Sequence, residues 1–137
     1  MKKSLVAAAV LAVAGVVLPA APAFAEPAQV PCSPGSGGKV YCNFWVPGNG
    51  WTGGSPVMEG PYPMGYLHQG TNWIVCQQLG PVASLPGYPQ WVNNWWAWTT
   101  ADNGNTGWVN AVAASGGDNY GKFSNTPNCN GAHGSPF

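Results

Sequence analysis

Few side chains in this chain of 137 residues could carry out acid–base, nucleophilic or metal chemistry. Charged residues make up only 6% of it, and its two histidines, His68 and His133, lack the spacing of a metal motif. Glu59 and Asp102 could serve as an acid pair for glycoside cleavage. Asp102, however, begins an Asn-Gly turn, where an aspartate side chain commonly bonds neighbouring amides. The sequence therefore predicts no catalytic residues, no bound metal and no cofactor, and so a protein that is not an enzyme.

Aromatic side chains are the groups best suited to bind a ligand. The chain has eight tryptophans, more than a core of this size can bury, and tryptophan is enriched at binding hot spots. Four residues are candidates for a surface on which sugars or peptides stack: Trp73, Tyr88, Trp91 and Trp95. The alternative for each is that its ring fills the core or covers a strand edge, because burial of an indole is itself stabilising. Exposed rings gathered on one concave face would favour binding.

The amino terminus has the pattern of a secretory signal peptide. Met1-Lys2-Lys3 is a short basic start, residues 5–17 are apolar, and Ala23-Phe24-Ala25 is a small-x-small cleavage site. The apolar run is shorter than the roughly 20 residues that a membrane-spanning helix needs. We expect residues 1–25 to be removed before Glu26, and the mature protein to be secreted and extracellular, with no membrane partner.

Charge and cysteine content narrow the class further. The mature part would hold two lysines against four acids, a net charge of −2, which gives no electrostatic footprint for nucleic acid. Four cysteines in a small exported domain favour two disulfides over a zinc site, which would need paired C-x-x-C spacing. Three pairings are possible. We favour Cys32–Cys42, which closes a Pro/Gly-rich loop, together with Cys76–Cys129, which ties a central strand to the tail.

The strand pattern predicts an all-β protein. Asn103-Gly104 lies between two aromatic runs and predicts a tight hairpin of residues 95–100 and 106–112, in which Gly107 allows close backbone approach. Whether Trp96 and Trp98 or Trp95 and Ala97 face the core is left open by the sequence. Further strands are expected at 40–46, 57–58, 64–67 and 71–78, with a long connection over Gly80–Val92.

These elements suggest four parts of the chain. After the signal peptide come an irregular Pro/Gly-rich arm held by its disulfide (26–55), a β-domain (56–129) and a flexible tail (130–137). Four aromatic residues of the arm suggest that it packs on the β-domain: Tyr41, Phe44, Trp45 and Trp51. Pro47 to Gly50 is expected to form a turn.

The β-domain resembles the bacterial SH3-like (SH3b) domains of secreted and cell-wall proteins. The resemblance covers residues 57–115 and rests on segments that match the family in order: Glu59-Gly60-Pro61, Met64 to Thr71, Trp73 to Gln77, Asn94-Trp95-Trp96 and Asn105 to Val109. It implies a small SH3-like barrel. Val75-Cys76-Gln77 and the ending Pro127-Asn128-Cys129 look like small exported actinobacterial members, and this likeness also supports the Cys76–Cys129 pair.

The resemblance implies a non-catalytic binding module that recognises cell-wall peptide or peptidoglycan. Two other classes remain open: an extracellular structural or protein-interaction protein of the matrix or spore surface, and a secreted inhibitor. Retention on purified cell walls would distinguish the first class from the others.

Overall fold

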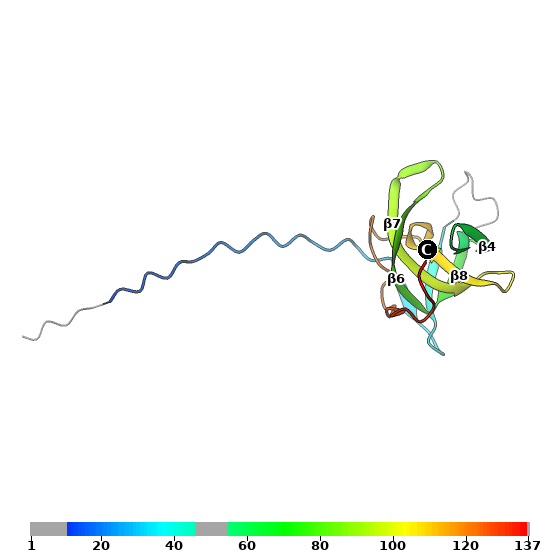
Figure 1. The fold of residues 1–137 in the computed structure, drawn as a ribbon, viewed down its shortest axis with the longest axis horizontal. Coiled ribbons are helices and arrows are strands. Elements are labelled where there is room, and N and C mark those ends of the chain that lie inside the picture. The colour runs from blue at the N-terminus through cyan, green and yellow to red at the C-terminus, as the bar shows by residue number, and fades with distance from the viewer. Residues whose placement is uncertain (1–10, 46–54, 137) are drawn as a thin grey trace, which may run out of the picture.

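The computed structural model describes residues 11–45 and 55–136, which form an all-β protein, as the sequence predicted. Figure 1 shows a β-rich body from which the amino-terminal segment extends. Residues 11–29 are exposed and form neither helix nor strand. The elements of the described part are β1 (Cys32–Pro34), β2 (Val40–Phe44), β3 (Ser55–Glu59), β4 (Tyr62–Leu67), β5 (Gly70–Ile74), β6 (Cys76–Leu85), β7 (Tyr88–Thr100), β8 (Thr106–Asn110) and a 3₁₀ helix, η1 (Ala111–Ala113).

The strands form two antiparallel sheets. One has the order β1-β2-β5, and the other has the order β4-β3-β8-β7-β6. Strands β1 and β2 come from the arm, so the arm supplies two of the three strands of the smaller sheet. Strands β4 and β6 are the edges of the larger sheet, and no strand pairing in the described residues joins them.

One hydrophobic cluster is shared by both sheets. Phe44 of β2 and Ile74 of β5 are fully buried in it beside Val57 of β3 and Val109 of β8. Phe123, from the segment after η1, completes it, with its ring centroid 6.3 Å from that of Phe44. The expectation that the arm packs on the β-domain is therefore confirmed at Phe44. Trp51 and the turn expected at 47–50 lie outside the described residues.

A second cluster on the other face of β7 settles the orientation of its aromatic run. Trp96 and Trp98 belong to this cluster, with Trp108 and the Cys76–Cys129 pair. Trp95 and Ala97 face the shared cluster instead. Both faces of β7 are thus covered, so the run is apolar throughout rather than alternating with polar residues.

The predicted hairpin is confirmed as β7 and β8. Trp98 pairs with Trp108 and Thr100 with Thr106, on either side of a turn at 101–105. A Cβ atom on Gly107 would come 2.5 Å from the Met58 carbonyl oxygen of β3. A side chain there would push the two backbones apart, so the expected close approach at Gly107 is also confirmed.

Two predictions about the middle of the chain were wrong. The single strand expected at 71–78 is divided into β5 and β6, which join different sheets on either side of Val75. The connection expected over Gly80–Val92 is instead the hairpin of β6 and β7. Its prolines suggested a loop, but Pro86 lies in a two-residue turn with Gly87 (φ +80°), and Pro81 and Pro89 lie where the strand register shifts.

Both favoured disulfides are present. Cys32 and Cys42 stand opposite each other in the register of β1 and β2, and Cys76 at the start of β6 is bonded to Cys129. All four cysteines are therefore paired, which indicates an oxidising compartment. Nowhere in residues 11–45 and 55–136 is there a helix with the length and apolarity to cross a membrane.

The tail, which we expected to fray, contacts the larger sheet. The ring of His133 stacks on Trp98 with centroids 4.5 Å apart and planes 5° apart. Gln78 of β6 donates a hydrogen bond from Nε2 to the Gly134 carbonyl at 2.9 Å, and Pro136 is fully buried. The backbone of residues 127–129, just before the tail, also bonds Gln77, so this segment and the tail together cover part of the β6 edge.

Candidate functional site

Three aromatic rings from distant parts of the chain meet beside the β6–β7 hairpin. Tyr88 and Trp91 stack, with centroids 4.7 Å apart and planes 6° apart. Trp45 meets both edge-on, at 5.6 Å from Tyr88 and 5.2 Å from Trp91. We call these three residues the ring cluster. Trp91 keeps 41% of its surface exposed, so the cluster is open to solvent.

A bulge in β7 brings Tyr88 and Trp91 to the same side. Residues three apart in a regular strand point to opposite faces. Here Leu85 pairs with Tyr88, and its neighbour Ser84 pairs with Val92, so residues 89–91 have no partner in β6. The extra residues change which face of the sheet the next side chains point to, as bulges do. Pro89 is compatible with this position because proline has no backbone N–H, and an N–H at this position would have no partner in β6.

Trp45 reaches the cluster through the end of β2. Its amide donates to the Ala113 carbonyl at 2.8 Å, and the Ser115 amide donates to the Asn43 carbonyl at 2.7 Å. Phe44 is paired with Ala114 between these two bonds. The segment after η1 therefore holds Trp45 against the hairpin, although the residues are more than forty positions apart in sequence.

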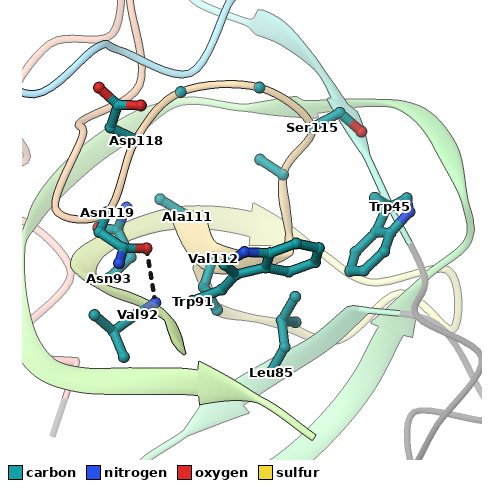
Figure 2. Close-up of a pocket in the computed structure, with 13 residues that line it drawn as sticks. Trp45, Leu85, Trp91, Val92, Asn93, Ala111, Val112, Ser115, Asp118 and Asn119 are labelled. Atoms are coloured by element: carbon teal, nitrogen blue, oxygen red, sulfur yellow. Dashed lines mark hydrogen bonds between the residues drawn. The ribbon is translucent and has the colours of Figure 1, made fainter. Parts of the chain in front are cut away.

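Two members of the ring cluster, Trp45 and Trp91, line a pocket of about 440 Å³ (Figure 2). Trp45 and Trp91 lie at one end, and Asp118 and Asn119 lie at the other. Leu85 and part of η1 supply apolar walls, whereas residues 115–119 supply hydroxyl, amide and backbone groups. Asn110 begins η1 as its N-cap, with Oδ1 accepting from the Val112 amide at 2.8 Å. Small-molecule sites have this size and this combination of apolar walls and a few polar groups.

Asn119 fixes the backbone on both sides of Trp91. Its Nδ2 donates to the Gln90 carbonyl at 2.8 Å, and its Oδ1 accepts from the Val92 amide at 3.0 Å (the dashed line in Figure 2). Because both neighbours of Trp91 are held by one side chain, Asn119 positions the ring without stacking on it.

Charge at the pocket is limited to one carboxylate. Asp118 is the single charged residue that lines it, and its Oδ2 accepts from the Ala28 amide at 3.1 Å. In the part of the chain that the structure describes, no group of three or more His, Cys, Asp or Glu residues could hold a metal ion.

The structure places two of the four candidate residues together and two elsewhere. Tyr88 and Trp91 belong to the ring cluster. Trp73 on β5 has the Lys39 ammonium 4.4 Å from its ring centroid and lines a separate hollow with Tyr41. Trp95 packs against the shared core cluster and lines a smaller surface hollow, so its ring is partly structural.

Asp102, which we assigned to a turn, contacts His68. His68 Nδ1 lies 2.9 Å from Asp102 Oδ2, and the same oxygen accepts from the His68 amide at 2.8 Å. The expectation that Asp102 bonds an amide of its own turn was wrong, because the amide that it accepts from belongs to the β4–β5 turn. Both side chains are exposed.

Comparisons with protein-family models, with curated proteins and with solved structures found no match to this chain.

Proposed function

We propose that this protein is a secreted, non-catalytic binding module that recognises peptidoglycan or cell-wall peptide through the ring cluster and its pocket. The observation that carries the proposal is the stack of Tyr88 on Trp91, whose ring is exposed and lines a concave pocket. Exposed aromatic rings at the rim of a polar pocket have the composition of a binding hot spot.

The gathering of these rings is more consistent with recognition than with a purely structural role. Trp91 lies in a bulge that interrupts strand pairing, and it remains 41% exposed. A ring that served only to stabilise the fold would gain more from full burial. The contacts of Asn119 hold the chain around Trp91, which is what a preorganised site requires.

The fold that we propose for the β-domain is the SH3-like barrel. The support is the order of motifs along residues 57–115 and the arrangement of β3, β8, β7 and β6 as neighbours in one sheet. Secretion is supported by the signal-peptide pattern and by the two disulfides. Under this proposal the described acids and histidines have structural rather than catalytic roles.

One surface favours a second candidate, an extracellular protein-interaction role. Leu79 and Val82 of the edge strand β6 are each more than half exposed. Apolar residues on an edge strand can pair with another chain. A protein of this class would associate with itself or with a matrix protein and would not bind the cell wall.

Sedimentation with purified cell walls tests the proposal. The protein should be found in the pellet at moderate salt, because stacking and hydrogen bonding depend weakly on ionic strength compared with surface charge. Recovery of all the protein in the supernatant would overturn the proposal. Self-association without wall binding would favour the second candidate.

Asn119→Ala should weaken wall binding about tenfold, which corresponds to about 1.4 kcal/mol. The variant loses both bonds that hold the backbone around Trp91, so the ring must be reordered each time a ligand binds. Binding isotherms with cell-wall fragments would measure the change.

Asn103→Ala is the matched control for Asn119→Ala. Asn103 also makes two hydrogen bonds, to the Met64 carbonyl and from the Asn105 amide, but it lies in the β7–β8 turn. Its loss should leave wall affinity unchanged. Equal weakening by both variants would show that the effect of Asn119 is not specific to the site.

A further inference from the structure

A second hollow adjoins the pocket across Trp91. This outer hollow has a volume of about 590 Å³ and is lined partly by residues 25–27, of which Ala25 would be removed with the expected signal peptide and Glu26 would become the amino terminus. It shares four lining residues with the pocket: Trp91, Gly117, Asp118 and Asn119. The two hollows therefore have Trp91 and residues 117–119 as a common border, and we call the two hollows together the groove.

The charge at the pocket end of this groove disfavours acidic ligands. Its charged lining residues are Asp118, which both hollows share, and Glu26 in the outer hollow. None of the residues that line the two hollows is a lysine, an arginine or a histidine. In the pocket, which residues 25–27 do not line, a bound carboxylate or phosphate would face Asp118 with no cationic side chain to compensate it, which is costly in a partly desolvated site.

The ring spacing disfavours a caged cation. An aromatic cage holds a quaternary ammonium group between rings that stand apart around it. The centroids of the ring cluster are only 4.7 to 5.6 Å from one another, so the rings fill the space that a caged group would need. What remains available to a ligand is the outward surface of the rings, above all that of Trp91.

A sugar ring fits these conditions. The C–H bonds on one face of a pyranose carry small positive charges, which are attracted to the negative face of an aromatic ring. Its hydroxyl groups can exchange hydrogen bonds with the polar rim formed by residues 115–119. Neither interaction requires a charged partner.

We propose that the groove binds a linear, uncharged sugar oligomer that crosses Trp91, with units in the pocket and in the outer hollow. This inference rests on the proposed function and assigns the site to the glycan of the wall rather than to its carboxylate-bearing peptides.

Calorimetric titration with N-acetylglucosamine oligomers, from the monosaccharide to the hexasaccharide, tests the assignment. Affinity should rise about tenfold or more with length until both hollows are filled, and it should change little with added salt. Trp91→Ala should remove the dependence on length, whereas Trp73→Ala, in a separate hollow, should retain it. Triglutamate and tetramethylammonium should bind more weakly than the longer oligomers.

An affinity that does not increase with length would overturn the inference, as would tighter binding of triglutamate or tetramethylammonium. Failure of the glycan assignment can be distinguished from failure of the proposed function. If walls retain the protein through Trp91 and the oligomers do not compete, the proposed function stands and the glycan assignment fails. If walls do not retain the protein, the proposed function itself fails.

Discussion

Trp91→Ala is expected to lower affinity for cell-wall fragments about 30-fold, the loss that corresponds to a hot-spot contribution of about 2 kcal/mol. Trp91 is the most exposed member of the ring cluster, since Trp45 and Tyr88 are half-buried, and it borders both hollows. Its removal deletes the stacking surface and also leaves Tyr88 without its parallel partner. Titration of soluble wall fragments against the purified variant would measure the loss.

The same substitution should leave the fold intact. Trp91 makes two ring contacts, each worth about 0.5–1.5 kcal/mol, which is less than the usual stability of a small domain. Trp73→Ala is the control, because Trp73 is also a partly exposed strand tryptophan and lines a different hollow. A weakening by Trp73→Ala as large as that by Trp91→Ala would contradict the location of the site.

Replacing Cys76 and Cys129 together with alanine is expected to lower the free energy of unfolding by about 4 kcal/mol. The two cysteines are 53 positions apart, and the entropy that a cross-link removes from the unfolded chain grows with loop length. The bond also lies in the second core cluster beside Trp96 and Trp108. Urea unfolding followed by tryptophan fluorescence would measure the difference.

The Cys32–Cys42 pair provides the comparison. Its cysteines are 10 positions apart, so removal of this bond should cost about 3 kcal/mol on the same chain-entropy argument. An equal or larger loss from the Cys32–Cys42 double variant would show that the long link is not the stronger constraint. The wild-type protein should also unfold at lower urea after reduction, by more than either double variant does.

Much of the strand content could be predicted from local pattern. The Asn103-Gly104 turn between aromatic runs is a short-range signal, and it located β8 and the end of β7 (95–100) correctly, although not the start of β7 at Tyr88. Cys32–Cys42 could be favoured because its loop is short and rich in turn formers. By contrast, the division between β5 and β6 at Val75 could not be predicted, because it depends on which sheet each half joins. The local sequence from Trp73 to Cys76 is typical of one continuous strand.

The candidate site could be predicted only in part. Tyr88 and Trp91 were identified from their residue types, but alternation in a regular strand would have placed them on opposite faces. Their stacking depends on the bulge at 89–91, for which Pro89 is the local signal. Trp45 was assigned to packing alone, because its place beside Trp91 depends on the pairing of β2 with residues 113–115, which no local pattern encodes.

Indole N–H resonances of the ¹⁵N-tryptophan-labelled protein offer the most direct test that the ring cluster and its pocket form the binding site. On addition of soluble peptidoglycan fragments, the Trp91 and Trp45 signals, assigned by single substitution, should shift progressively and saturate. The Trp73 and Trp108 signals should stay in place, since Trp73 lines a separate hollow and Trp108 is buried in the second core cluster. Shifts confined to Trp73, or no shift of the Trp91 signal at saturating fragment, would contradict the account.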